Sequence, residues 1–508
     1  MRTRILKILL AVFCFVLLAF HLARPIVLTA VDIGRHVKNG ELLLQGQWDV
    51  LYHNFYSFTH PNHPFINHHW FFGVMSYGVY KLAGFTGLSI VFIAVMLAAL
   101  FFFLSAALAR GRFALVMLLT AAALPLLSYR GEIRPEGISL LFMGMYFYFL
   151  TKLSLGKVRP GVVFAVLGTA QLIWVNTHIF FFMGPALVLV FLWEGKVRGC
   201  TVCVRRLRPL LALVTLVNVI NPSGLAGALT PLNIFKGFGY RLAENQNAFF
   251  MISRFPGKSI YLYGLVLVIA FMALMLLSMF MRGFKRDAPF IVLGFFVSLA
   301  ALKAVRLLSP FGFFFIPLGA YFAGQLEGRL NAGRQRALRA VFFCATAVLL
   351  LVFASDVKKE ELGLGLIRGV NASAQFFRDN GLQGPIFSNY DIGGYLIYHL
   401  AGREKVFVDN RGEAFPPEFF KNVYVPMQED EAVWNKVDGQ YKFNTVYFYR
   451  HDLTPWGQGF LVGLIKNPDW APVFVDGYTI IFAKRKGPNQ RIIDRFELPR
   501  SMFGVSHP

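Results

Sequence analysis

Long apolar runs separated by short polar loops fill the first 355 residues of this 508-residue chain. A helix needs about 20 predominantly apolar residues to cross the hydrocarbon core of a membrane. The pattern predicts eleven spans, near residues 6–24, 88–109, 113–128, 137–153, 161–176, 178–194, 209–222, 259–281, 287–303, 307–325 and 338–354. Because this number is odd, the two ends of the chain are expected on opposite sides of the membrane.

Two longer segments interrupt this alternation of span and loop. In residues 32–84, apolar residues at helical spacing near both ends, such as Ile33, Val37, Phe71 and Val74, predict helices that lie along the membrane interface. The tail, residues 356–508, alternates short strand-like and helical runs. It predicts strands at 385–389, 395–400, 405–410 and 445–450 and within 472–485, with helices at 373–381, 416–425 and 459–467.

These patterns together predict an α-helical polytopic membrane protein. Its transmembrane domain would comprise residues 1–355, with 32–84 as a long first outer loop, and residues 356–508 would form a small exported α/β domain. A content of 56% hydrophobic residues and a mean hydropathy of +0.55 agree with this class and exclude an ordinary soluble domain. A basic start before an apolar run also suits a signal peptide, but no small-x-small cleavage site follows, so a retained first span is expected.

The net charge of +23 comes from the hydrophobic part, because basic and acidic residues balance in the tail. Basic residues gather in alternate loops, near residues 2–7, 110–112, 152–159, 196–208, 282–286 and 329–339. This distribution follows the positive-inside rule and predicts a cytoplasmic N-terminus and an exported tail, rather than a nucleic-acid partner. In the loop 196–208, Cys200 and Cys203 lack a second cysteine pair, so two thiols are expected there rather than a zinc site.

The outer loops hold the candidate chemistry. Only nine carboxylates occur in the first 355 residues, and the predicted topology places six of them on the outer side. The polar residues expected at this interface are Asp32, His36 and His69; Arg130, Glu132, Arg134 and Glu136; Asn176 and His178; Lys236, Arg241 and Glu244; and Lys303 and Arg306. Arginine and lysine at headgroup depth can hold a lipid phosphate as it leaves, and a carboxylate can act as a base toward an incoming hydroxyl.

The sequence resembles the GT-C superfamily of membrane glycosyltransferases, which includes protein O-mannosyltransferases, oligosaccharyltransferases and the lipid A aminoarabinose transferase. The resemblance rests on an acid directly after the first span (Asp32), a long amphipathic first outer loop, many spans and an exported tail. More narrowly, DIGRHVKNGELLLQG, RPEG, WVNTH, NPSG, NYDIGGYLI and KVFVDNRGEAFP look like a bacterial branch of that superfamily.

The resemblance implies roles for individual residues. Asp32 matches the catalytic aspartate that activates the acceptor, and Arg306 matches the residue that grips the donor phosphate, with Lys303 and Arg134 as helpers. Substrate-binding positions would be His36, His69, Glu132, Glu136, Asn176, His178 and Glu244. Many relatives carry a second acid beside the aspartate, whereas this chain has Ile33, so we expect no metal and no other cofactor.

The implied reaction is an inverting transfer of a hexosyl or pentosyl group. The sugar would move from a polyprenyl-phosphate donor to a hydroxyl of a glycan, a lipid or an exported protein, in the inner membrane of a bacterium. Other interpretations stay open. Asp32 is also a suitable N-cap for a helix that begins at Ile33, and the RPEG carboxylates suit simple pairing with Arg130 and Arg134. The chain as a whole also suits a flippase or a non-catalytic assembly subunit.

Overall fold

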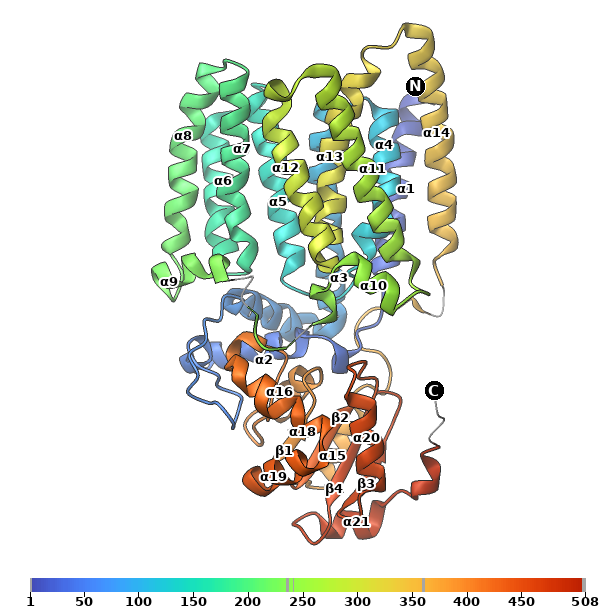
Figure 1. Cartoon of the computed structure of the whole chain (residues 1–508). Helices are drawn as coiled ribbons and strands as arrows, with labels where there is room; N and C mark the ends of the chain where they lie inside the picture. The colour runs from blue at the N-terminus through green and yellow to red at the C-terminus, as the bar shows by residue number, and fades with distance from the viewer. Residues whose placement is uncertain (1, 234–236, 241, 359–360, 505–508) are drawn as a thin grey trace. The chain divides into compact units, whose positions relative to one another are not determined.

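The computed structural model of the chain describes residues 2–233, 237–240, 242–358 and 361–504, and helices dominate them (Figure 1). Contacts between residues divide the chain into two compact units. The first, here called the membrane unit, contains Met1–Arg24, Ser89–Leu232 and Arg241–Leu364. The second, the loop–tail unit, contains Pro25–Leu88, Asn233–Tyr240 and Gly365–Pro508. The predicted functional division at residue 355, into a catalytic and an exported domain, stays a prediction.

The membrane unit is a bundle of apolar helices. They are α1 (Arg2–Leu22), the later part of α3 (Trp70–Arg110), α4 (Phe113–Ser128), α5 (Glu136–Ser154), α6 (Pro160–Val175), α7 (Met183–Val197), α8 (Thr201–Leu216), α11 (Ser259–Arg282), α12 (Phe284–Lys303), α13 (Leu308–Glu327) and α14 (Ala332–Ser355). A helix is found at each predicted span. Short helices α9 (Gly224–Leu229) and α10 (Ala248–Arg254) lie in the long connection between α8 and α11.

Length and apolar composition qualify seven of the described helices to cross a membrane, or eight if a bent pair in Thr201–Asn233 is one span. Helices α4 and α6 are apolar but, at 16 residues each, too short to qualify, and α12 begins with the charged run Lys285, Arg286 and Asp287. The chain is therefore a multi-pass membrane protein, as the hydropathy pattern predicts.

Several buried polar side chains inside the membrane unit form one hydrogen-bond network. The Tyr146 hydroxyl on α5 donates to Gln171 Oε1 on α6 over 2.7 Å. The Gln171 amide donates to the carbonyl of Phe181 and to Asn218 Oδ1, over 2.9 and 2.6 Å. Because an unpaired polar group costs several kcal/mol away from water, roughly 2–7 by transfer data, this network ties four segments together in one arrangement.

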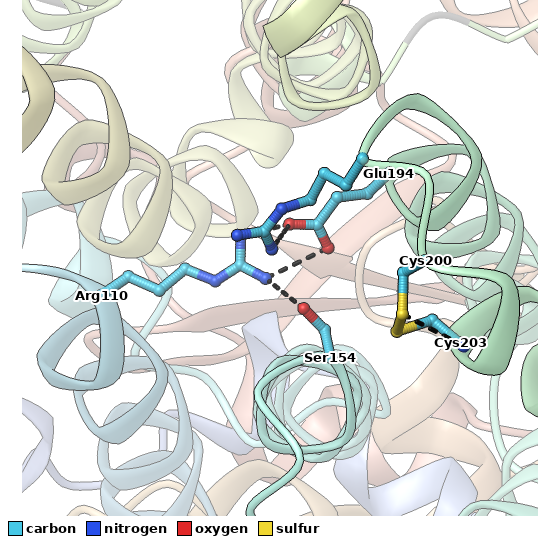
Figure 2. Close-up of a disulfide and its surroundings, with 6 residues drawn as sticks. Arg110, Ser154, Glu194, Cys200 and Cys203 are labelled. Atoms are coloured by element: carbon cyan, nitrogen blue, oxygen red, sulfur yellow. Dashed lines mark hydrogen bonds and ion pairs between the residues drawn. A yellow bond between two sulfur atoms is a disulfide. The ribbon is translucent and has the colours of Figure 1, made fainter.

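The ends of helices that lead into the basic loops meet at one end of the bundle. Arg110, which ends α3, donates to both carboxylate oxygens of Glu194 on α7, over 2.7 and 3.1 Å, and to Ser154 Oγ at the end of α5 (Figure 2). Arg112 pairs similarly with Glu327 at the end of α13, over 2.7 Å. The predicted gathering of these loops on one side is therefore confirmed; which side faces the cytoplasm stays a prediction.

Figure 2 also shows that Cys200 and Cys203 are joined in a disulfide. The prediction of two separate thiols is wrong. Cys200 stands at the N-cap of α8, where the first helical turn brings the two Cα atoms to 5.3 Å, and its sulfur accepts a hydrogen bond from the backbone N–H of Cys203. This Cα separation is common for disulfides.

The loop–tail unit combines the first outer loop with a small mixed sheet. Its helices are α2 (Ile33–Leu44), the first turns of α3, α15 (Ala372–Asp379), α16 (Gly393–Leu400), α17 (Pro417–Phe419), α18 (Pro426–Glu429), α19 (Glu431–Tyr441), α20 (Gly457–Lys466) and α21 (Gln490–Phe496). The strands are β1 (Ile386–Ser388), β2 (Thr445–Tyr449), β3 (Trp470–Val475) and β4 (Thr479–Lys484), in the order β1-β2-β4-β3. Strand β1 pairs with β2 in parallel, and the other pairs are antiparallel.

Two predicted strands are wrong. Residues 395–400 belong to helix α16, whose buried face includes Tyr395, Leu396 and Leu400, because a short apolar run suits either a strand or a buried helix. Residues 405–410 form no strand; their pairing is limited to isolated bridges of Val406 with Ser57 and Ile386. The other predicted strands and the helices at 373–381, 416–425 and 459–467 are confirmed in outline.

Helices are found where the two interfacial helices were predicted, as α2 and as the first turns of α3, and their position at the membrane interface stays a prediction. Helix α3 continues into the second predicted span, with a kink at Gly84. The backbone there has φ +61° and ψ −160°, a conformation that is open to glycine and costly for residues with a Cβ. Gly84 therefore lets one helix change direction where the sequence predicted two separate elements.

The Arg110–Glu194 pair gives a stability prediction. Both side chains are nearly buried, with 11% and 6% exposure, so Glu194→Leu leaves a guanidinium without its main partner. We expect a loss of about 3 kcal/mol, in the range for breaking a buried pair. Thermal and denaturant unfolding of the purified protein in detergent measures it. The matched control is Arg198→Ala, which removes a 52% exposed cation from the same carboxylate and should cost less than about 1 kcal/mol. Equal losses would contradict the expectation.

Candidate functional site

Three arginines and two glutamates meet at the end of the membrane unit opposite the basic loops; we call them the arginine cluster. Arg130 and Arg134 lie in the loop after α4, and Glu136 is the first residue of α5. Glu244 lies in a single 3₁₀ turn (Ala243–Asn245), and Arg306 lies in another (Val305–Leu307) between α12 and α13. Loops far apart in the sequence therefore supply one charged site.

Glu244 is the centre of this cluster. Arg130 and Arg134 each donate to Glu244 Oε2 over 2.9 Å. Arg306 lies 3.4 Å from Glu244 Oε1 and donates to Glu136 Oε1 over 3.1 Å. The simple pairing of Glu136 and Arg130 that the sequence suggested is longer, at 3.8 Å. Each carboxylate therefore bridges guanidinium groups from different loops.

A small hollow adjoins the cluster. Arg130, Glu136 and Arg306 line its polar side, and Phe92, Leu140 and Phe180 line its apolar side. Charged and apolar side chains therefore meet at this hollow.

Burial alone raises the pKa of the Glu244 carboxyl, but the positive charges of Arg134, Arg130 and Arg306 outweigh it and hold the pKa well below its ordinary range. Glu244 is therefore ionised at neutral pH, and its charge offsets part of the positive charge of the three arginines.

Other predicted residues of the membrane unit lie in different settings. Glu132 is 44% exposed and lies 4.0 Å from Arg130. His178 is buried and hydrogen-bonded through Nδ1 to Ser139 Oγ, over 2.8 Å. The Asn176 amide donates to the carbonyls of Leu172 and Ile220, over 2.9 Å each, so this side chain ties the end of α6 to the chain after α8.

The remaining cationic candidates are only partly described. Lys303 is exposed at the C-terminus of α12. Two further predicted outer cations, Lys236 and Arg241, lie outside the described residues.

Asp32 lies in the loop–tail unit, at the start of α2. Its side chain makes no capping hydrogen bond to that helix, so the N-cap interpretation is wrong. Asp32 Oδ1 instead accepts a hydrogen bond from the side-chain amide of Asn410. The same amide accepts through Oδ1 from Arg35 Nε, over 3.1 Å. Asn410 therefore bridges an acid and a base that stand one helical turn apart on α2.

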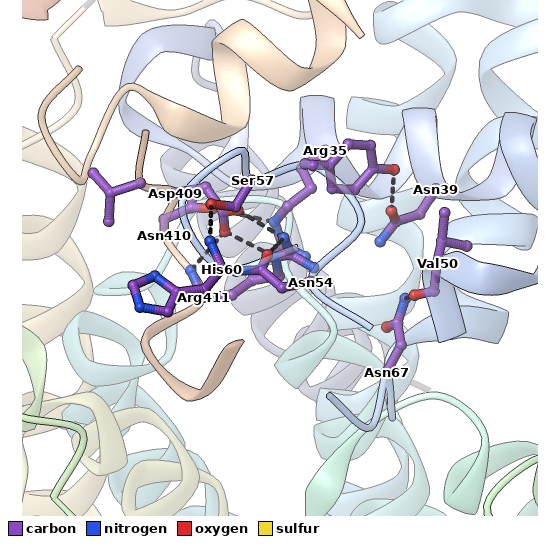
Figure 3. Close-up of polar contacts among 12 residues, drawn as sticks. Arg35, Asn39, Val50, Asn54, Ser57, His60, Asn67, Asp409, Asn410 and Arg411 are labelled. Atoms are coloured by element: carbon purple, nitrogen blue, oxygen red, sulfur yellow. Dashed lines mark hydrogen bonds and ion pairs between the residues drawn. The ribbon is translucent and has the colours of Figure 1, made fainter. Parts of the chain in front are cut away.

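The residues on both sides of Asn410 are buried and ionic. Arg411, 2% exposed, donates to both carboxylate oxygens of Asp409, over 2.8 and 2.6 Å, and to Asn54 Oδ1 over 2.9 Å (Figure 3). Its guanidinium also lies over the rings of Tyr56 and Phe65, at 5.2 and 4.9 Å from their centroids. The tail loop is thereby fixed against the first outer loop.

The histidine candidates of the first outer loop also come together. The rings of His36 and His69 meet edge-on with centroids 5.6 Å apart, and Phe72 packs on the other edge of His36 at 5.0 Å. Across the described ranges, no group of three or more histidine, cysteine or acidic residues is arranged to hold a metal ion. The expectation that no metal takes part stays a prediction.

Sequence reasoning missed Arg35 and Asn410. The run KVFVDNRGEAFP forms part of the family resemblance, and nothing in it singles out the asparagine between Asp409 and Arg411. An amide has no charge or periodicity that singles it out, and its partner Asp32 lies 378 positions away.

Neither the protein-family models nor the curated proteins contain a match to this sequence. Solved structures match it over most of its length, and they define its class: the chain has the GT-C fold of membrane glycosyltransferases. The archaeal oligosaccharyltransferase AglB from Archaeoglobus fulgidus, in complex with an inhibitory peptide and a dolichol-phosphate, has a TM-score of 0.59 at 9% identity, covering 95% of this chain and 74% of AglB.

ArnT from Cupriavidus metallidurans is similar over nearly its whole length. In the apo state it has a TM-score of 0.53 at 16% identity, with 95% of this chain and 98% of ArnT covered. Bound to undecaprenyl phosphate it has a TM-score of 0.52 at 16% identity, covering 97% and 99%. At these identities the likeness establishes the fold.

The depressed pKa of Glu244 predicts a pH dependence of stability. Since its folded-state pKa lies below the ordinary value of 4.5, its stabilising effect is full above that value and is lost as pH falls toward the folded-state pKa. We therefore expect wild type to exceed Glu244→Gln in melting temperature at neutral pH, and the gap to narrow below about pH 4.5. Parallel thermal scans across pH measure the gap. Glu132→Gln, which changes an exposed carboxylate in a neighbouring loop, is the control and should lower the melting temperature by less. If the difference in melting temperature between wild type and Glu244→Gln did not change with pH, the lowered pKa of Glu244 would be refuted.

Proposed function

We propose that the protein is a membrane glycosyltransferase that takes a sugar from a polyprenyl-phosphate donor and delivers it to a hydroxyl acceptor. The observation that carries the proposal is the GT-C fold over 95% of the chain, which spans nearly all of ArnT. Two neighbours with this fold were solved with a lipid phosphate, a dolichol-phosphate in AglB and undecaprenyl phosphate in ArnT. A lipid-linked donor explains why such a site stands at the end of a membrane bundle.

The arginine cluster is the donor site in this proposal. Arg306, with Arg134 and Lys303 as the helpers that the resemblance suggests, would bind the phosphate and stabilise it as a leaving group. The hollow beside Arg306 supports this role, because apolar side chains lie next to the guanidinium groups there, which suits a phosphate attached to a hydrocarbon chain. Glu136 and Glu244 hold the guanidinium groups in place, and Glu132, Asn176 and His178 remain candidates for contacts with the sugar or acceptor.

Asp32 is the proposed base, with His36 and His69 as neighbouring substrate contacts. The acceptor oxygen forms a bond to the anomeric carbon while the bond from that carbon to the phosphate oxygen breaks. The acceptor proton passes to Asp32, and the lipid phosphate leaves with the bonding electron pair. A single displacement of this kind inverts the anomeric centre and needs no covalent intermediate or metal.

The compartment follows from the charge pattern. The basic loops gather at one end of the membrane unit and the arginine cluster at the other, which supports a cytoplasmic N-terminus and a reaction on the outer face of a bacterial inner membrane. The transferred group would be a hexosyl or pentosyl unit, and the acceptor a glycan, lipid or exported protein.

The first test compares cells by mass spectrometry of surface glycans, glycolipids and secreted proteins. A deletion strain should lose one sugar modification, wild type should restore it, and Asp32→Asn should not, because an amide cannot accept the acceptor proton. Asp49→Asn, a change of an exposed aspartate in the same outer loop, is the control and should restore the sugar. An unchanged set of glycans in every strain would overturn the proposal in favour of transport or assembly.

The second test addresses the donor phosphate. Arg306→Gln should reduce transfer about 10²-fold, since removing one donor to a developing anion costs that much in other enzymes. Arg306→Lys should retain more activity than the glutamine variant because it keeps the charge. Arg254→Gln, at an exposed arginine at the end of α10, serves as control. Initial rates with a titrated lipid fraction as donor measure the effect, and full activity of Arg306→Gln would exclude Arg306 from the donor site.

A further inference from the structure

We infer that Asn410 is a positioning residue that orients the Asp32 carboxylate for its task as base. The inference rests on the proposed function, because it assumes that Asp32 takes the acceptor proton. It gives the tail a part in catalysis that neither its fold nor its sequence pattern assigns.

The direction of two hydrogen bonds sets the orientation of the Asn410 amide. A guanidinium can only donate, and an ionised carboxylate can only accept. Arg35 Nε donates to Asn410 Oδ1 over 3.1 Å, so the amide oxygen must face Arg35 and the amide nitrogen must face Asp32. Asn410 Nδ2 then donates to Asp32 Oδ1. Arg35 therefore fixes the amide in the one orientation that supports an ionised Asp32.

The loop that carries Asn410 is held rigidly on both sides of this residue. On one side Asp409 is fully buried, and on the other Arg411 is bound to Asp409 and Asn54. The backbone N–H of Arg411 also donates to Asp409 Oδ1, over 3.0 Å. Because both flanking side chains are fixed, the amide of Asn410 has little freedom to follow a displaced partner.

Helix α16 approaches this loop closely. A Cβ at Gly393 would lie 2.4 Å from the Asp409 Cα, and a Cβ at Gly394 would lie 3.1 Å from Asn410 Nδ2. Helix α16 also packs directly on α2, where the Tyr398 Cβ would lie 3.0 Å from a Cβ at Gly34. The glycine pair thus allows the loop to sit against α16 while α16 sits against the helix that carries Asp32 and Arg35.

Together these contacts let the tail fix the orientation of the Asp32 carboxylate. A base must be within hydrogen-bond reach of the proton it takes, and a misplacement of 1 Å can cost about 10²-fold in rate. Asn410 acts on Asp32 and is assigned no contact with the sugar or the phosphate. Its loss should therefore change turnover and leave substrate binding nearly intact.

The test uses purified full-length protein, with the lipid fraction of the deletion strain as donor and its envelope fraction as acceptor. Asn410→Leu keeps the approximate volume and removes both hydrogen bonds. We expect kcat to fall about 10-fold to 10²-fold, with the apparent KM for each fraction within about 2-fold of wild type. Asn380→Leu is the matched control, since the Asn380 amide donates to the Phe376 carbonyl on its own helix, and it should keep the wild-type kcat.

Asn410→Asp separates positioning from simple structural support. The aspartate has the shape of the asparagine and keeps an oxygen that accepts the hydrogen bond from Arg35. If Asn410 had only a structural role, this substitution would leave kcat unchanged. A positioning residue would not tolerate it, because the substitution replaces the donor that faces Asp32 with a second acceptor. We expect kcat for Asn410→Asp at or below that for Asn410→Leu, with a melting temperature near that of wild type.

The outcomes separate the two hypotheses. If wild type transfers sugar, Asp32→Asn is inactive and Asn410→Asp keeps the wild-type kcat, the inference fails and the proposed function stands. If wild type transfers no sugar between these fractions, the proposed function fails, and the inference fails with it. A fall in kcat with an equal rise in KM for both fractions would also overturn positioning in favour of a general loss of structure.

Discussion

The cost of burying an unpaired charge governs the arrangement of polar groups in this chain. An ion in or next to hydrocarbon costs several kcal/mol, roughly 2.5–3.5 on insertion scales, unless a partner offsets it. The few carboxylates of the membrane unit accordingly pair with arginines: Glu194 with Arg110, Asp287 with Arg282, Glu327 with Arg112, Glu136 with Arg306 and Glu244 with Arg130. These pairs lie at helix ends or in the loops between helices. The same constraint therefore also concentrates cations at the end of the bundle where we place a phosphate.

The organisation of the membrane unit could be predicted from sequence because hydropathy and charge report it residue by residue. Every predicted span coincides with a helix, and the loop that carries Arg110 and Arg112 meets the ends of α7 and α13, as the charge pattern requires. The cluster of Arg134, Glu136 and Arg306 could be expected in outline for the same reason, since alternate loops must share a face. The choice of partners within it could not, because several guanidinium groups compete for Glu244 and only packing decides between them.

The loop–tail unit was harder to predict because its order comes from contacts between distant segments. The composition of the run YLIYHL suited a strand, yet this run belongs to helix α16. The first turn of α16 lies so close to the loop 408–410 that a Cβ at Gly393 or Gly394 would crowd its atoms. Asn410 carried no signal at all. Its role depends on Asp32 and Arg35, which stand more than 370 positions earlier in the chain.

The sequence distance between these partners also has a consequence for biosynthesis. Asn54 and Arg411 lie 357 positions apart, and chains grow at about 5–20 residues per second. The first outer loop therefore waits roughly 20–70 s after its synthesis before its partner emerges, while the helices between them enter the membrane. During that interval its aromatic and histidine-rich surface lacks the tail that later covers it. A chaperone, or the membrane surface itself, would have to shelter the loop until translation ends.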